Sequence, residues 1–216
     1  MIKLNNVTKY YPSNLGKQYI LKNLSFSIPQ NHNIAILGAN GAGKSTLFRL
    51  LAGSEYPNKG QITTNLSISW PVALATGIHA KMTGRENTRF IARVNGVANI
   101  DAYEKKVKEF AELGVKYDLP VQTYSSGMRA KLAFACCIAI DFDVYLIDEA
   151  TSVGDPKFKR KAKNALLQKS KSASVIMVSH DLKEIREFCD SAIIMYKGKL
   201  EFCNDLEIAI EKYQAL

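Results

Sequence analysis

The N-terminal third of the chain carries the apolar spacing of β-strands. In residues 24–28 apolar and polar side chains alternate, as they do in a strand with one buried face. Residues 33–37 form a nearly continuous apolar run that ends in glycines, which is typical of a parallel strand buried on both faces. A helix is predicted after this run as far as Ala52, where Gly53 stops it. Residues 61–70 predict one or two further strands.

The middle of the chain changes to helical signals. Thr83 with Glu86, and Asp101 with Glu104, have the spacing of a capping box. In that motif the first side chain caps a helix and the glutamate bonds back to it. The two boxes predict an α-helical subdomain inserted over about residues 83–140.

Strands and helices alternate in the last third of the chain. Residues 143–147 and 174–178 predict buried strands, each followed by a capped helix, and Pro156 occupies a favourable first-turn position. A short C-terminal helix is predicted to begin at residues 204–207. The alternation predicts an α/β fold with a mostly parallel core sheet flanked by helices. The N-terminal strands are expected to form an antiparallel β subdomain.

The composition is that of an ordinary folded protein. Of 216 residues 47% are hydrophobic, and 13 glycines with 6 prolines are too few for a disordered or collagen-like chain. The longest unbroken apolar run, residues 132–140, is far shorter than a membrane span of about 18 residues. The N-terminus lacks the features of a secretory signal, so a cytosolic chain is expected. The four cysteines show no C-x-x-C spacing, and neither zinc nor disulfides are expected.

The charge is basic and unevenly spread. The chain has 29 Lys+Arg against 20 Asp+Glu, a net charge of +9, and no acidic residue lies in the basic stretch 156–171. Phe158, Ala162, Ala165 and Leu166 are spaced to bury one face of a helix there, which leaves the basic side chains to solvent. This basic face is interpreted either as a solvated surface or as a surface attracted to an acidic partner or to an anionic membrane leaflet.

A glycine-rich loop lies between the apolar strand and the first helix. Residues 38–45 match the pattern G-x-x-x-x-G-K-[ST] of a P-loop. Glycines let successive backbone N–H groups converge on phosphate oxygens, and the helix N-terminus adds positive partial charge. Lys44 is placed for the β- and γ-phosphates and Ser45 for Mg²⁺. The predicted nucleotide-binding residues are Gly38, Asn40, Gly41, Ala42, Gly43, Lys44, Ser45 and Thr46.

Two adjacent carboxylates end a predicted strand. Asp148 follows four apolar residues, so its side chain emerges at the carboxyl edge of the sheet, where ligands of parallel sheets collect. Asp148 suits a Mg²⁺ ligand, and Glu149 beside it can accept a proton from an attacking water.

Three further motifs complete an ordered set. Residues 124–128, Tyr-Ser-Ser-Gly-Met, open a predicted helix; residues 152–155, Ser-Val-Gly-Asp, follow the acidic pair; and His180 follows a strand. Together with the loop at residues 38–45, this order resembles the ATP-binding-cassette (ABC) ATPases. The resemblance covers essentially the whole chain, residues 1–216, as a single ATP-binding domain.

The resemblance implies a P-loop NTPase fold of the ABC type, ATP and Mg²⁺ as ligands, and a role for each matching residue. Glu149 is the implied catalytic base, and His180 the residue that contacts the γ-phosphate. Tyr11 matches the aromatic residue that stacks on adenine, although the adjacent Tyr10 leaves that choice open. The family pairs two cassettes head to tail, so that each signature motif faces the nucleotide of the partner. The residues implied to do so are Ser125, Ser126 and Gly127, a variant signature motif, and Asp155 of the matching D-loop.

The chain departs from the family at one position. Family members usually carry a glutamine after the strand that follows the P-loop and its helix, where the glutamine serves as a Mg²⁺ ligand. Residues 65–83 contain none, which leaves main chain, water or His79 to fill its role. Trp70-Pro71 and the variant signature closely resemble the ATP-binding subunit of bacterial capsular-polysaccharide (polysialic-acid-type) exporters. That resemblance implies a homodimer of cassettes on an integral-membrane permease, at the cytoplasmic face of the inner membrane. The exported capsular polysaccharide is then not bound by this chain directly.

A different class of function is a soluble ABC-type ATPase that acts on nucleic acid or ribosomes. The net charge allows it, but such proteins usually carry two cassettes or long coiled-coil insertions, and no heptad run is present. The basic stretch also lacks interleaved aromatic residues for base stacking, so no nucleic-acid partner is expected. A catalytically inactive cassette is disfavoured because Lys44, Asp148, Glu149 and His180 are all present.

Overall fold

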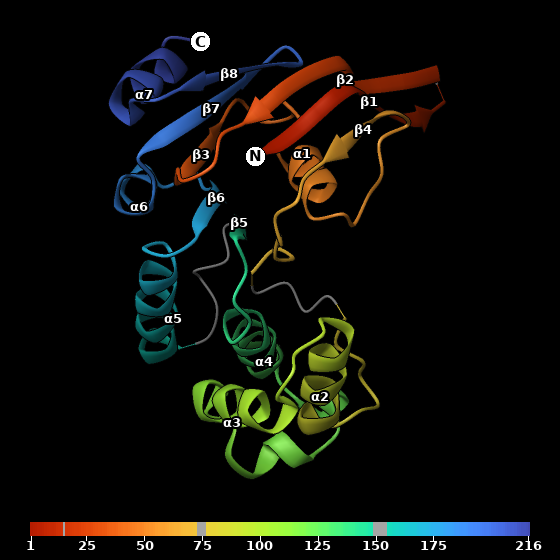
Figure 1. The fold of residues 1–216 in the computed structure, drawn as a ribbon, viewed down its shortest axis with the longest axis vertical. Helices are drawn as coiled ribbons and strands as arrows, with labels where there is room; N and C mark the ends of the chain where they lie inside the picture. Colours follow the sequence, from red (N-terminus) through yellow and green to blue (C-terminus); the bar gives the residue numbers. More distant parts are fainter. Residues whose placement is uncertain (15, 73–76, 149–154) are drawn as a thin grey trace. The chain divides into compact units, whose positions relative to one another are not determined.

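The computed structural model describes the chain except for residues 15, 73–76 and 149–154 (Figure 1). The described residues form two compact units. The core unit takes its residues from 1–71, 142–149 and 170–216, and the helical unit from 72–141 and 150–169. Each unit is described by itself below.

The core unit begins with a three-stranded antiparallel sheet in the order β2-β1-β4. Its strands are β1 (Ile2–Ser13), β2 (Gly16–Ile28) and β4 (Lys59–Thr63). The alternating residues that predicted β2 behave as expected, because Leu24 and Ile28 are buried. The antiparallel β subdomain expected from the sequence is confirmed.

The second sheet of the core unit has five strands in the order β5-β6-β3-β7-β8. The first four are parallel to one another and β8 is antiparallel to β7. Their bounds are β3 (Ile34–Leu37), β5 (Val144–Asp148), β6 (Ser174–Val178), β7 (Ser191–Tyr196) and β8 (Lys199–Cys203). All four residues of β3 are buried, as an apolar strand in the centre of a sheet requires.

The hairpin of β7 and β8 was not predicted from the sequence. Lys197 and Gly198 join the two strands, and both have positive φ, 48° and 75°. This pair suits a tight hairpin turn, in which both central residues need such φ values. The turn signal was therefore present in Lys-Gly, followed by the alternating residues 199–203.

Helix α1 (Lys44–Leu51) packs against apolar residues of both sheets in the hydrophobic core. Leu47 and Phe48 are almost completely buried in one hydrophobic cluster with residues of β1, β2, β3, β5, β6 and β7. Burial of such a side chain contributes about 1.5–3 kcal/mol each to stability. Two further helices, both capped by an aspartate, belong to the core unit: α6 (Leu182–Phe188) and α7 (Leu206–Gln214), with α7 against β7 (Figure 1).

The helical unit contains four α-helices and two 3-10 turns among its described residues. They are α2 (Gly84–Val94), α3 (Ile100–Ala111), η1 (Gly114–Asp118), η2 (Val121–Thr123), α4 (Ser126–Ile138) and α5 (Pro156–Lys169). Phe110, Phe134 and Phe158 bring α3, α4 and α5 together, with ring centroids 5.7–5.8 Å apart. Of the apolar face expected on α5, Phe158, Ala162 and Leu166 are buried, while Ala165 is half-buried.

One of the two expected capping boxes forms and the other does not. The Thr83 hydroxyl accepts from the Glu86 N–H and the Glu86 carboxylate accepts in return, so the box at the start of α2 is confirmed. At α3 the cap is Asn99, whose side chain accepts from the Ala102 N–H. The prediction that Asp101 caps this helix is therefore wrong, because the Asn99 amide starts it two residues earlier.

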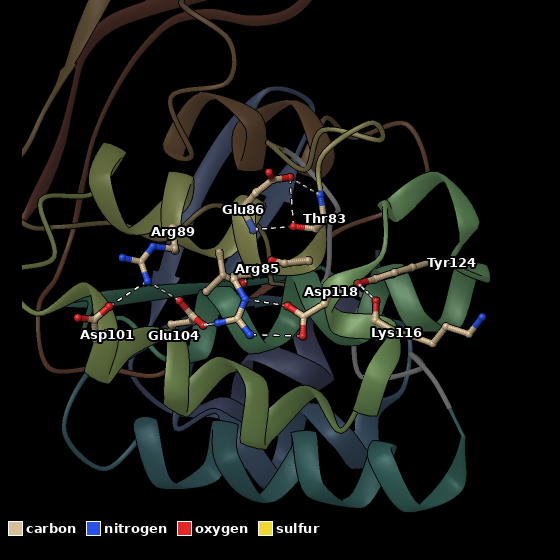
Figure 2. Close-up of polar contacts among 11 residues, drawn as sticks. Thr83, Arg85, Glu86, Arg89, Asp101, Glu104, Lys116, Asp118 and Tyr124 are labelled. Carbon is tan, nitrogen blue, oxygen red and sulfur yellow. Dashed lines mark hydrogen bonds and ion pairs between the residues drawn. The ribbon is translucent and has the colours of Figure 1, made fainter.

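Glu104, expected in that second box, is instead the centre of an ion-pair cluster (Figure 2). Its side chain is only 9% exposed and accepts hydrogen bonds from Arg85 and Arg89 of α2. Arg89 also pairs with Asp101, and Arg85 with Asp118 at the end of η1. The cluster thus joins α3 to α2 through the nearly buried Glu104 carboxylate, and η1 to α2 through Asp118.

All four cysteines are buried thiols outside any disulfide. Burial raises the pKa of the Cys136 and Cys189 thiols to about 12. None of the helices in the described parts of the chain is long and apolar enough to span a membrane.

Replacement of Glu104 by Ala is expected to destabilise the protein by about 2–3 kcal/mol, because it leaves two arginines without their nearly buried partner. The control is Glu109→Ala on the exposed face of the same helix, which should change stability by less than about 0.5 kcal/mol. Urea unfolding of the full chain measures both. Equal midpoints for the two variants would contradict the structural role given to Glu104.

Candidate functional site

The loop between β3 and α1 turns the chain out of the sheet and into a helix. Gly41 and Gly43 have φ values of 81° and 104°, a region that favours glycine. The Ala42 N–H donates to the Ala39 carbonyl at 3.1 Å and closes the turn. Gly43 caps α1 without a side chain, so the N–H groups of the first turn are presented at the loop as an anion-binding helix terminus.

At two positions of the loop there is no room for any side chain, so glycine is also required on steric grounds. A Cβ at Gly38 would lie 2.5 Å from the main-chain oxygen of Met195. A Cβ at Gly43 would lie 2.6 Å from a methyl group of Ile20 and 2.7 Å from the Met195 Cε. The loop can take this path only because these positions lack side chains.

Lys44, the first residue of α1, reaches back across the loop. Its Nζ donates to the carbonyl oxygens of Gly38 at 2.6 Å and Ala39 at 3.1 Å, and the residue is 9% exposed. A nearly buried ammonium held beside converging N–H groups creates a strongly positive concave surface.

The loop forms one wall of a cavity of about 390 Å³ in the core unit. Residues from β5 and β6 supply the opposite side, because carboxyl ends of parallel strands meet at one edge of a sheet. The lining residues are Asn40, Gly41, Gly43, Lys44, Ser45, Thr46, Asp148, Val178 and His180. The structure thus brings together most of the phosphate-site residues with Asp148, the candidate metal ligand, and His180, the candidate γ-phosphate contact.

The side chains around this cavity suit a Mg²⁺-bound polyphosphate. Asp148 is the half-buried last residue of β5, whereas Ser45 and His180 are exposed in the cavity. Among the described residues no three His, Cys, Asp or Glu side chains gather to hold a metal alone. One carboxylate with one hydroxyl is the donor set by which Mg²⁺ is held when phosphates and waters complete its octahedron, so these residues fit the ion.

The two adjacent tyrosines of β1 have different surroundings. The Tyr10 ring packs on Tyr19, at 5.4 Å between centroids. The Tyr11 hydroxyl donates to the Glu55 Oε2 at 2.7 Å and accepts from the Arg49 Nη2 at 3.1 Å. Arg49 lies on α1, so Tyr11 and not Tyr10 is linked to the helix that begins at the loop. Sequence reasoning missed Arg49 and Glu55, since their contacts with Tyr11 span long separations and leave no local pattern.

The remaining described candidates belong to the helical unit. The Ser125 hydroxyl caps α4 by accepting from the Met128 N–H at 3.2 Å, and Ser126 and Gly127 follow in the first turn. Asp155 caps α5 through the Phe158 N–H at 2.9 Å. The Lys131 ammonium, 2.5 Å from the Asp155 carboxylate, lowers the pKa of that carboxyl group to about 2.

Two of the candidates lie wholly or partly outside the described residues. They are Glu149 and residues 152–154 of the Ser-Val-Gly-Asp motif. His79, considered as a substitute for the missing glutamine, belongs to the helical unit, where its main-chain N–H donates to the Asn87 Oδ1 at 2.7 Å.

Comparison with known proteins agrees with the family that the order of motifs indicated. Residues 21–152 match the model of a family described as ABC transporter. The polysialic acid transport ATP-binding protein KpsT of Escherichia coli is 43% identical, over 99% of this chain and 96% of that protein. The ATP-binding protein BexA of Haemophilus influenzae is 44% identical, over 99% and 98%. The capsule polysaccharide export ATP-binding protein CtrD of Neisseria meningitidis serogroup B is 43% identical over 100% of both chains.

Two solved structures share the fold. An ATP-binding subunit of an ABC transporter gives a TM-score of 0.78 at 21% identity, covering 99% of this chain and 93% of that one. A dimeric ATP-binding cassette in a post-hydrolysis state with ADP and Pi gives 0.75 at 22% identity, covering 93% and 97%. At these identities the likeness shows the fold alone, and it confirms the fold class expected from the sequence.

Replacement of Gly38 by Ala is expected to destabilise the protein by about 2–3 kcal/mol, because the new methyl group meets main chain that cannot turn aside. Gly41→Ala is the matched control, since a Cβ there has open space and is strained only by its positive φ. That control should cost about 1 kcal/mol. Urea unfolding compares the two, and an equal or larger loss for Gly41→Ala would contradict the steric requirement at Gly38.

Proposed function

The chain belongs to the ABC transporter family, and on that premise we propose that it is the ATP-hydrolysing subunit of an exporter of capsular polysaccharide. The observation that carries the proposal is the cavity that Lys44, Ser45, Asp148 and His180 line together with residues of the glycine loop. The substrate class is supported by the relatives named above, whose names describe transport of polysialic acid and export of capsule polysaccharide.

In the proposed site the loop binds the phosphates of ATP. Its N–H groups and the N-terminus of α1 receive the phosphate oxygens, and the Lys44 ammonium exchanges its carbonyl partners for the β- and γ-phosphates. Tyr11 stacks on adenine. Asn40, Ala42 and Thr46 complete the loop around the phosphates.

Ser45 and Asp148 are the proposed holders of Mg²⁺, Asp148 through a water. When bound, the ion screens the phosphate charge and polarises the terminal phosphoryl group. Glu149, next in the chain after Asp148, accepts the proton of the attacking water. The His180 imidazole, in the same cavity as Lys44, donates a hydrogen bond to the γ-phosphate.

The helical unit supplies the other half of the proposed site in a homodimer. Ser125 caps α4, so the first-turn N–H groups at Ser126 and Gly127 are available to the γ-phosphate held by a second copy. Asp155 belongs to the loop at that same dimer interface. An integral-membrane permease at the inner membrane is the proposed partner, with the cassettes on its cytoplasmic face and the polysaccharide passing through the permease.

The alternative function, that of an ATPase acting on nucleic acid or ribosomes, is less well supported. The names of the three relatives describe transport and export, or ATP binding alone. Within the helical unit, moreover, basic side chains of α5 have acidic partners. Lys161 and Lys157 pair with Glu112, at 2.6 and 3.4 Å, and Lys169 pairs with Asp141. These pairs favour the interpretation of α5 as a solvated face.

Replacement of Lys44 by Ala is expected to weaken Mg-ATP binding roughly 10–100-fold, because it removes a charge-assisted phosphate contact of about 1.5–3 kcal/mol. Calorimetric titration measures the affinity. Lys59→Ala, which removes an exposed lysine of the same unit, should leave it unchanged. An unaltered ATP affinity in the Lys44 variant would contradict the proposal that this loop binds the phosphates of ATP.

Replacement of Glu149 by Gln is expected to leave ATP bound but not hydrolysed, since the amide keeps the size of the side chain and loses the proton acceptor. The expected consequence is a stable ATP-dependent dimer. Size-exclusion chromatography with Mg-ATP and a phosphate-release assay test the two effects together. A monomer that releases phosphate at the normal rate would contradict both the base and the closed dimer.

A further inference from the structure

The Tyr11 hydroxyl is hydrogen-bonded to two residues that are distant in sequence, Glu55 and Arg49, and Lys9 of the same strand lies beside them. Glu55, in the turn after α1, accepts a hydrogen bond from the Tyr11 hydroxyl at Oε2 and another from the Arg49 Nε at Oε1, at 2.7 and 2.6 Å. The Arg49 Nη2 donates back to the same hydroxyl at 3.1 Å. The Lys9 ammonium lies 2.8 Å from the Glu55 Oε2 and 5.1 Å from the centre of the Tyr11 ring.

We propose that Glu55 and Arg49 are positioning residues for nucleotide-base recognition, which fix the Tyr11 ring as a preformed platform for adenine. The proposal rests on the proposed function, because it takes Tyr11 as the residue that stacks on the base. It adds residues that do not touch the nucleotide and a reason why this position holds a tyrosine.

The geometry restrains the ring at its tip as well as at its backbone. A phenol oxygen that both donates to one group and accepts from another is fixed in position, which fixes the direction in which the ring's long axis points. Rotation of the ring plane about that axis is restrained by the Lys9 ammonium over one face. Lys9 occupies one face of the ring, so a base can stack only on the other. A ring held in this way loses less conformational freedom when the base arrives than an unrestrained ring would.

Glu55, Arg49 and Lys9 are together called the clamp on Tyr11. The clamp is charged and partly buried, which makes its hydrogen bonds strong. Hydrogen bonding by Lys9, and then by Tyr11, lowers the pKa of Glu55 to about 2, so its carboxylate is ionised at neutral pH. The Glu55 and Lys9 side chains are 25% and 10% exposed. Charge-assisted bonds of this kind are shorter and stronger than neutral ones.

The clamp also joins the base platform to the phosphate site. Arg49 lies on the same short helix as Lys44 and Ser45, and its Nη2 is 3.3 Å from the Thr46 Oγ1. One helix therefore begins at the phosphate loop and ends at the group that holds Tyr11. The distance between the base and phosphate subsites is then set within the core unit alone.

The test separates base recognition from phosphate binding by comparing ATP with inorganic tripolyphosphate, each with Mg²⁺, in calorimetric titrations of the full chain. Tyr11→Phe keeps the ring and removes the clamped oxygen. It is expected to weaken ATP about 3–10-fold and to leave tripolyphosphate unchanged. Glu55→Ala should have the same effect, and the double variant should be no weaker than either single one, because both act through one hydroxyl. Glu55→Gln, which still accepts from the hydroxyl, should recover part of the loss.

Tyr10→Phe is the matched control, since Tyr10 packs on Tyr19 instead, and it should bind ATP like the unchanged protein. Tyr11→Phe that binds ATP as tightly as the unchanged protein, while Tyr11→Ala does not, would overturn the clamp and leave stacking intact. Equal losses for ATP and tripolyphosphate in the Glu55 variants would also overturn it in favour of a purely structural role. An unchanged protein that binds no ATP at all would overturn the proposed function itself.

Discussion

The closeness of two backbone segments governs the rest of the core unit. At Gly38 the chain leaves β3 so near the main chain of Met195 in β7 that a single added carbon would collide with it. The contact follows from parallel pairing of β3 with β7 in the buried centre of the sheet. Because the chain can leave only by this path, α1 begins directly at the edge where β5 and β6 also end. Lys44, Asp148 and His180 reach one cavity for that reason.

Different interactions stabilise the interior of each unit. The core unit relies on one large hydrophobic cluster around α1, in which shape and volume decide stability. The helical unit combines a small aromatic group with the ion pairs of Glu104 (Figure 2). Ion pairs depend on direction more than apolar contacts do, so this cluster constrains the angles between α2, α3 and η1 in addition to the buried apolar residues that these elements share.

The mostly parallel core sheet, the phosphate loop and the start of α2 could be predicted from the sequence, because they depend on local patterns: apolar runs, glycine spacing and the capping box of Thr83. The order of the strands within the sheets was not among these predictions. The same reasoning failed at Asp101, where two capping residues compete and the amide of Asn99 wins. It also missed the clamp on Tyr11. Arg49 and Glu55 stand 38 and 44 residues from Tyr11 in sequence, so only the folded sheet and helix bring them together.

The burial of every cysteine has a consequence for the protein's redox chemistry. Nucleophilic attack and oxidation need a thiolate that solvent can reach. Cys136 and Cys189 have pKa values near 12, and Cys137 and Cys203 are buried too. The native thiols should therefore stay inert toward peroxide, glutathione and maleimides while the fold is intact. A single cysteine introduced on the surface would then be the one reactive thiol in an otherwise unaltered chain, ready to carry a spectroscopic label.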